Sequence, residues 1–241
     1  MLKGLKRASI LCVAVLMAAS TAKAAPYLYG DFIGMNPGEV DFLQVKENSV
    51  TDPGLIPLFD GNGMPIRIGN TLKFTPTTFV SFAQGGSADT TSGTLTMRIR
   101  ADVGQFLGEI RIREIGDASL LGSGNAATAA TINGLLVLSD IDPGLLSTQT
   151  SILTVNPAAP YTLPGTGFVA FVAETVINLT GLGVREVAFN FNNTLQTTSQ
   201  NGTTSFIQKK EIQIIVPEPG TVSLLIVGAA LILRRGRRRP I

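Results

Sequence analysis

The sequence has little of the side-chain chemistry on which most enzymes depend. Its 241 residues include no His, no Trp, three Tyr and a single Cys, Cys12. Without His, the Ser-His-Asp and Cys-His forms of nucleophilic catalysis and imidazole-ligated zinc are excluded. No glycine-rich nucleotide loop stands between a predicted strand and a predicted helix. We therefore expect no catalytic residues, no cofactor and no metal site, and the chain is interpreted as a non-enzyme.

One enzymatic and one metal-binding alternative remain open. Asp140 and Asp142 would be the carboxylate pair if the chain were a secreted carbohydrate-active enzyme, although two Asp beside a Pro-Gly turn are typical of a solvated loop. The segment Asp60–Gly63 resembles the opening of a calcium loop. Met64 occupies its next ligand position and no Glu completes it, so turn formation is the simpler interpretation. The metal-binding alternative that stays open is a calcium site assembled from several loops.

The first 24 residues are typical of a secretory signal peptide. Three basic residues precede an apolar run from Ile10 to Ala19. Ala22 and Ala24 give the small-x-small form of a cleavage site, so we expect cleavage after Ala24. The sequence thus predicts an N-terminal signal helix that is removed during export.

Residues 216–241 combine a rigid tripeptide, an apolar run and a basic end. The prolines of Pro217-Glu218-Pro219 predict a stiff, exposed spacer. The uncharged run Thr221–Leu233 predicts a helix of about 20 Å, shorter than a hydrocarbon core of ~30 Å and therefore a marginal membrane anchor. A buried core helix is the alternative. The membrane helix is favoured by five basic residues that stay on the cytoplasmic side, namely Arg234, Arg235, Arg237, Arg238 and Arg239.

The order of these three parts resembles the PEP-CTERM sorting domain. The resemblance covers residues 216–241 alone, with Pro217, Glu218 and Pro219 as the sorting motif, and Gly220 stands where the family often has Ser or Thr. It implies a Gram-negative precursor held transiently in the inner membrane and processed by an exosortase. It also implies a destination in the cell envelope or extracellular matrix, with exopolysaccharide or biofilm as the setting. A permanently membrane-tethered surface protein is the alternative.

Residues 25–215 form the predicted passenger domain. Removing the two terminal segments reduces the basic residues from 19 to 10 and the acidic residues from 17 to 16, so the passenger carries a net charge of −6. An acidic body argues against nucleic-acid binding. Cys12 falls within the signal peptide, so the passenger has no disulfide. Its length of about 190 residues is sufficient for one hydrophobic core.

The passenger is predicted to be all-β, an antiparallel β-sandwich or jelly-roll-like domain. Apolar and polar side chains alternate clearly over Leu95–Arg100, and turn signals such as Asn201-Gly202 separate the runs. One helical turn is expected at Ala126–Ala130, ended by Asn133-Gly134. Strands are expected at Glu39–Lys46, Ile66–Leu72, Phe74–Ala83, Leu95–Ala101, Glu109–Ile115, Leu135–Leu138, Ile152–Val155, Phe168–Ile177, Val184–Phe191 and Ser205–Val216.

Four arginines suggest a contact surface for an acidic exopolysaccharide. We expect Leu95–Ala101 and Glu109–Ile115 to pair as a hairpin. The two-residue period would then gather the guanidinium groups on one outer face, where they suit carboxylate and sulfate groups. The alternative is a solvated sheet face with local ion pairs. The residues concerned are Arg98, Arg100, Arg111 and Arg113.

Overall fold

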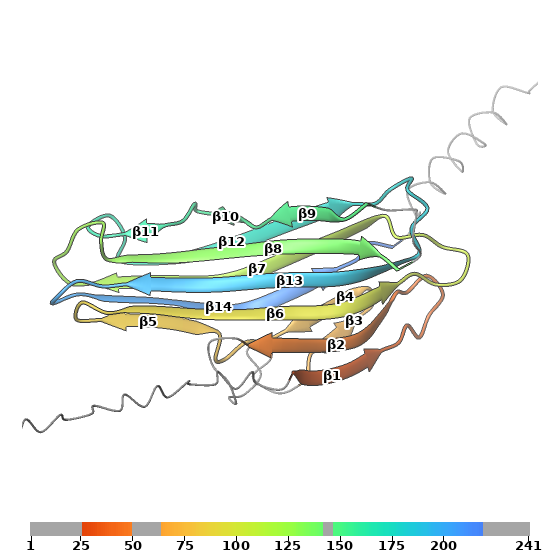
Figure 1. The fold of residues 1–241 in the computed structure, drawn as a ribbon, viewed down its shortest axis with the longest axis horizontal. Helices are drawn as coiled ribbons and strands as arrows, with labels where there is room; N and C mark the ends of the chain where they lie inside the picture. Colours follow the sequence, from red (N-terminus) through yellow and green to blue (C-terminus); the bar gives the residue numbers. More distant parts are fainter. Residues whose placement is uncertain (1–25, 50–63, 142–146, 219–241) are drawn as a thin grey trace, which may run out of the picture.

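The computed structural model describes residues 26–49, 64–141 and 147–218. Within these residues the chain forms two antiparallel sheets of seven strands, with no helix. Their long strands run along the length of the molecule (Figure 1). The inner faces of both sheets contribute to one cluster of buried apolar side chains, so the architecture is a β-sandwich. The all-β, antiparallel prediction is confirmed.

The two sheets are called sheet A and sheet B. Sheet A has the order β1-β2-β6-β13-β8-β11, with β9 also paired to β8. Its strands are β1 (Tyr27–Phe32), β2 (Asp41–Ser49), β6 (Ala88–Arg100), β8 (Ala129–Asp140), β9 (Gln149–Ile152), β11 (Tyr161–Thr162) and β13 (Glu186–Thr198). Sheet B has the order β10-β12-β7-β14-β4-β3, with β5 also paired to β14. Its strands are β3 (Ile66–Ile68), β4 (Thr71–Phe74), β5 (Val80–Gln84), β7 (Glu109–Leu121), β10 (Thr154–Asn156), β12 (Phe168–Asn178) and β14 (Thr204–Ile215).

Strand β13 shows how the sequence produces these layers. Its apolar residues Val187, Phe189 and Phe191 are buried, whereas Ala188 and Asn190 between them are at least partly exposed. This two-residue period places alternate side chains on opposite faces of a sheet. Burying a Phe or Val side chain stabilises the fold by about 1.5–3 kcal/mol. The inward-facing apolar side chains of the strands therefore hold the two sheets together.

The strand predictions are confirmed in type and corrected in detail. All ten predicted runs overlap observed strands, but the predicted run Ile66–Leu72 is a tight hairpin of β3 and β4. Gly69 lies at its turn with a φ of +55°, a conformation that glycine adopts readily. The predicted helical turn at Ala126–Ala130 is wrong, because a non-helical turn there leads directly into β8. Asn133-Gly134 lies within that strand.

The predicted hairpin between Leu95–Ala101 and Glu109–Ile115 is wrong. Strand β6 contains the first segment and pairs with β2 and β13 in sheet A. Strand β7 contains the second and pairs with β12 and β14 in sheet B. The loop between them crosses from one sheet to the other, so their apolar sides face each other across the core.

The predicted terminal segments fall largely outside the described residues. This is true of the signal peptide, including Ala22 and Ala24, and of Pro219 and the five arginines of the tail. No helix long and apolar enough to span a membrane occurs in the part of the chain that the structure describes. Val216 is the last buried residue in the part of the chain that is described, and its N–H donates a hydrogen bond to the Asn70 carbonyl oxygen. Pro217 and Glu218 follow it and are exposed.

Candidate functional site

The four arginines predicted to form one patch lie on two opposite surfaces. Arg98 and Arg100 project from the outer face of sheet A, and Arg111 and Arg113 project from the outer face of sheet B. The single patch is therefore wrong, because β6 and β7 belong to different sheets. Each arginine has a carboxylate partner, in the pairs Arg98–Glu186 (2.6 Å), Arg100–Asp41 (2.7 Å), Arg111–Glu109 (3.1 Å) and Arg113–Glu174 (3.2 Å).

The outer face of sheet A is rich in uncharged hydrogen-bonding groups. On β6, every second residue from Thr90 to Thr96 carries a hydroxyl group. On the neighbouring β13, the outward residues Asn190 and Asn192 carry amide groups. Asn192 accepts a hydrogen bond of 2.5 Å from the Thr94 hydroxyl, which links the two strands. We call this surface the Thr/Asn face, composed of Thr90, Ser92, Thr94, Thr96, Asn190, Asn192, Thr194 and Gln196.

A shallow groove of about 520 Å³ lies at one part of this face. It crosses four neighbouring strands, β2, β6, β13 and β8. Its polar lining residues are Gln44, Lys46, Thr96, Arg98, Ser139, Asn190 and Asn192. No carboxylate side chain among the described residues lines it. The groove thus offers amide, hydroxyl and cationic groups to a ligand that lies along the sheet.

A β-bulge in β2 contributes the edge of the groove. The pairing of β2 with β6 is shifted between Leu43 and Lys46, and Gln44 has a φ of +53°. The Gln44 N–H donates a 2.6 Å hydrogen bond to Asp31 on the adjacent strand β1, which stabilises this conformation. As a result, both Gln44 and Lys46 are exposed while Val45 between them is buried. Because of the bulge, Lys46 lies on the outer face, at the groove. In a regular strand the two-residue period would place it on the inner face.

The two cations of the groove differ in their surroundings. Arg98 is partly neutralised by its ion pair with Glu186, and its side chain remains 37% exposed. Lys46 is exposed and has no carboxylate within ion-pairing distance among the described residues. An exposed ammonium group of this kind is free to attract an anionic ligand.

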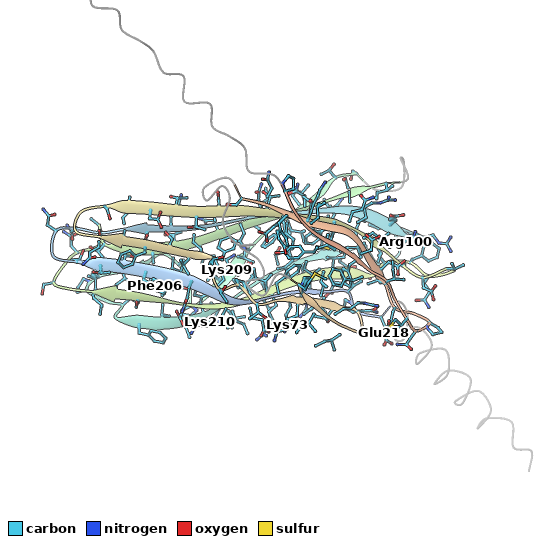
Figure 2. All side chains as sticks on the ribbon, turned by 90° about the horizontal axis from the view of Figure 1, so that it is seen from below. Lys73, Arg100, Phe206, Lys209, Lys210 and Glu218 are labelled. Carbon is cyan, nitrogen blue, oxygen red and sulfur yellow. The ribbon has the colours of Figure 1, made fainter. Side chains whose placement is uncertain are left out.

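A second cleft, of about 440 Å³, lies at one end of the sandwich and contains several carboxylates. Asp41 is paired with Arg100, and this hydrogen bond raises the pKa of the guanidinium group. Hydrogen bonds from the Gly38 and Val103 N–H groups lower the pKa of Asp102. Asp102 therefore stays ionised, which is the opposite of what a general acid requires. Arg100 lies toward the same end of the molecule as Glu218 (Figure 2).

A row of aromatic side chains lies on the outer face of sheet B. Phe206 on β14 pairs with Phe82 on β5 on one side and with Ser119 on β7 on the other. Ser119 pairs in turn with Phe168 on β12. Phe82 and Phe168 are exposed, and Phe206 lies along β14 in Figure 2. This row is a second surface on which a sugar ring or an apolar partner could lie.

The other sequence candidates contribute little to the described surface. Asp60–Gly63 and Asp142 lie outside the described residues, and Asp140 is the last residue of β8. Within residues 26–49, 64–141 and 147–218, no group of three or more acidic side chains is placed to hold a metal ion. The groove residues Gln44, Lys46 and Asn190 were not predicted, since their proximity depends on strands that are distant in the sequence.

Comparison with known proteins gives no assignment. No protein-family model matches the chain. No curated protein matches it significantly. Among solved structures, one similarity is to a structure described as TmCBM61 in complex with β-1,4-galactotriose, with 10% identity and a TM-score of 0.21, covering 60% of this chain and 88% of that chain. At this TM-score the likeness carries no argument about the ligand of the present protein.

Proposed function

We propose that the protein is an exported, non-enzymatic component of the cell envelope or extracellular matrix that binds an acidic exopolysaccharide through the groove of sheet A. One observation carries the proposal. The groove combines the amides of Asn190 and Asn192 with the cations Lys46 and Arg98, and none of its described lining residues is a carboxylate. This composition is unusual on a passenger whose net charge is −6.

The chemistry of the groove suits a polymer of acidic sugars. Sugar hydroxyls both donate and accept hydrogen bonds, and amide and hydroxyl side chains do the same. A uronate carboxylate adds a negative charge that a guanidinium or ammonium group binds with a charge-assisted hydrogen bond. Neighbouring strands are about 4.8 Å apart and alternate residues of one strand about 6.8 Å apart, so the Thr/Asn face repeats its polar groups at regular intervals. A long polymer therefore gains several weak contacts at once.

The delivery of this domain is part of the proposal. The signal peptide would direct export, and the PEP-CTERM-like tail would hold the precursor in the inner membrane until an exosortase acts. The exposure of Pro217 and Glu218 directly after the buried Val216 supports this order, since a protease must reach the motif in the folded protein. A permanent membrane tether remains the alternative for the tail.

A non-enzymatic role is favoured because the carboxylates of the second cleft, at the end of the sandwich, already have ionic or hydrogen-bonding partners. Asp41 and Glu186 are held by arginines, and Asp102 by backbone N–H groups. A glycosidase needs one carboxyl group that stays protonated near neutral pH. The rival enzyme would have to use residues elsewhere, such as Asp140 and Asp142.

The test is binding of the purified full-length protein to polygalacturonate, with neutral dextran as the comparison polymer. Binding to polygalacturonate should weaken as salt is added, because surface charges are screened beyond about 10 Å at 0.1 M ionic strength. The double variant Lys46→Ser/Arg98→Ser should lose at least about tenfold in affinity, since each charge-assisted hydrogen bond contributes roughly 1.5–3 kcal/mol.

The matched control is Arg111→Ser/Arg113→Ser, which removes two charges from the opposite sheet. We expect this variant to bind like the wild type. Equal losses in both double variants would show attraction to charge in general and would refute the groove. A loss that appears only in Phe82→Ser/Phe168→Ser would move the binding surface to the aromatic row of sheet B.

A further inference from the structure

Three polar side chains that do not line the proposed groove meet in the hydrophobic core. The Lys209 and Glu114 side chains are both fully buried, and Asn193 is 1% exposed. Lys209 Nζ lies 2.9 Å from Glu114 Oε1 and 2.8 Å from Oε2. The Asn193 amide nitrogen donates a hydrogen bond to the same Oε1 atom. We call these three residues the core triad.

The core triad joins the two sheets. Lys209 on β14 and Glu114 on β7 come from sheet B, and Asn193 on β13 comes from sheet A. A bulge in β14 follows Lys209, and the Lys209 N–H donates to the carbonyl oxygen of Phe79. Figure 2 labels both Lys209 and its neighbour Lys210, which, unlike Lys209, is exposed and forms an ion pair with Asp117.

Two aromatic rings lie next to the Lys209 ammonium group. Lys209 Nζ lies 4.6 Å from the centre of the Phe79 ring and 6.0 Å from that of Phe191. Both phenylalanines are fully buried. The Asn193 Oδ1 atom is also buried and has no hydrogen-bond partner. Such an orphaned acceptor normally costs about 1–3 kcal/mol.

Stability alone does not account for these residues. The desolvation of a buried ion pair often exceeds its Coulombic gain, so apolar residues of similar volume would serve the core as well or better. The triad also includes an amide with an unused oxygen. Buried polar groups that weaken a core are expected where they have a chemical task.

Burial moves both ionisable groups toward their neutral forms. Desolvation lowers the pKa of Lys209 to about 8, against the opposing effect of Glu114. Desolvation also raises the pKa of Glu114, against Lys209 and Asn193. The gap between the two pKa values narrows, so the pair can exist as a neutral amine beside a neutral carboxylic acid. A neutral amine in an apolar pocket is a nucleophile.

We propose that Lys209 and Asn193 become joined by an intramolecular isopeptide bond, with Glu114 as the catalytic acid and base. Lys209 Nζ and Asn193 Nδ2 both donate a hydrogen bond to Glu114 Oε1. Because they share this acceptor, the two nitrogen atoms are at most about 6 Å apart. Rotation of the Asn193 side-chain amide exchanges its oxygen and nitrogen and brings Oδ1 to the protonated Glu114. The hydrogen bond from Glu114 then polarises the Asn193 carbonyl group. The same rotation gives Asn193 Oδ1 a hydrogen-bond donor, which it otherwise lacks.

The reaction exchanges one amide for another. The Lys209 Nζ lone pair attacks Asn193 Cγ, and a C–N bond forms. Rotation of the tetrahedral Cγ group returns Nδ2 to Glu114, which gives its own proton to Nδ2 and accepts a proton from Nζ in exchange. The Cγ–Nδ2 bond then breaks, and ammonia leaves. The product is a secondary amide, no oxidant or water is consumed, and Glu114 returns to its starting form.

The fold itself supplies the reaction conditions. The core holds nucleophile, electrophile and proton carrier together, which replaces a bimolecular encounter by an intramolecular one. The unfolded chain has no such arrangement, so the bond should form only after folding. It would link β13 to β14, and thus sheet A to sheet B, in a passenger that has no cysteine for a disulfide.

The test is peptide mapping of the purified full-length protein after folding, denaturation and trypsin digestion. Residues 186–209 contain no internal Lys or Arg, so one tryptic peptide carries both Asn193 and Lys209. Without the bond, trypsin cleaves after Lys209 and releases a peptide of full mass. With the bond, cleavage after Lys209 is blocked, and the peptide Glu186–Lys210 appears with the mass of one ammonia missing. Its tandem mass spectrum should lack backbone fragments between Asn193 and Lys209.

Two variants serve as controls. Glu114→Gln keeps the shape of the side chain and should reduce the cross-linked peptide at least tenfold. Lys209→Arg should abolish the loss of ammonia. If ammonia is still lost in Lys209→Arg, the change is a succinimide at Asn193 and the proposal is wrong. A wild-type digest dominated by the full-mass peptide ending at Lys209 would also overturn it, whatever the variants do.

Discussion

Replacing Glu114 by glutamine should make the stability of the protein depend on pH between about 8 and 10.5. The variant keeps the volume of the side chain but removes the carboxylate that faces Lys209. Glu114 opposes the effect of burial on Lys209, whose pKa is already lowered from 10.5 to about 8 in the folded protein. Without the carboxylate, the pKa of the folded state should be lower still.

The sign and size of the effect follow from proton linkage. Between the folded and unfolded pKa values, the unfolded chain binds one proton more than the folded protein at Lys209. The free energy of unfolding therefore falls as pH falls, by about 1.4 kcal/mol per pH unit. A pKa lowered from 10.5 to about 8 corresponds to roughly 3 kcal/mol, which is a minimum for the variant. Removing one partner of a buried pair typically costs about 3–5 kcal/mol, in agreement with this value.

Urea unfolding followed by circular dichroism between pH 8 and 10 measures this slope. The matched control is the double variant Glu114→Gln/Lys209→Met, in which the titrating amine is also absent. Other groups such as tyrosines titrate in both variants, so the difference between the two curves isolates Lys209. If that difference does not change with pH, Lys209 is not a free, buried amine in the variant, and the reasoning fails.

Two further predictions concern the packing of sheet B and the tail. Gly116→Ala should lower the free energy of unfolding by about 1–3 kcal/mol or more, because a Cβ atom there would lie 2.2 Å from the Gln208 carbonyl oxygen and 2.4 Å from the Phe171 ring. Gly167→Ala, where a Cβ meets no atom within 4 Å, should change it little, and equal urea midpoints for the two variants would contradict this account. Mass spectrometry of the mature protein should show that the basic tail is absent, and Glu218→Ala should leave a larger, membrane-retained species; a wild-type protein that still ends at the chain terminus would indicate a permanent anchor.

Local patterns were sufficient to predict the strands, because side-chain alternation is a property of adjacent residues. They were insufficient to predict which strands pair. Strands β6 and β7 are consecutive, yet they belong to opposite sheets, and the long-range ladders to β13 and β14 decide this. The arginine patch was therefore misplaced, although each arginine was correctly predicted to lie on an outer face.

The core triad could in part have been found from the same alternation. On β14, Lys209 is two residues after the buried Ile207, so both side chains face inward. On β7, Glu114 follows the buried Ile112 in the same way. Asn193 follows Phe191 in the same way on β13. The period shows that these polar residues face inward. Their contact depends on the stacking of the two sheets, which no local pattern contains.

The position of β14 has a mechanical consequence. This strand is bonded to β7 along one side and to β5 and β4 along the other, and the chain leaves the sandwich directly from its end. A pull applied at Pro217 along the strand therefore loads both hydrogen-bonded ladders in shear, so that many bonds must break together. A strand attached at the rim of a sheet would instead peel away one bond at a time. The two ladders of β14 together resist tension applied at Pro217.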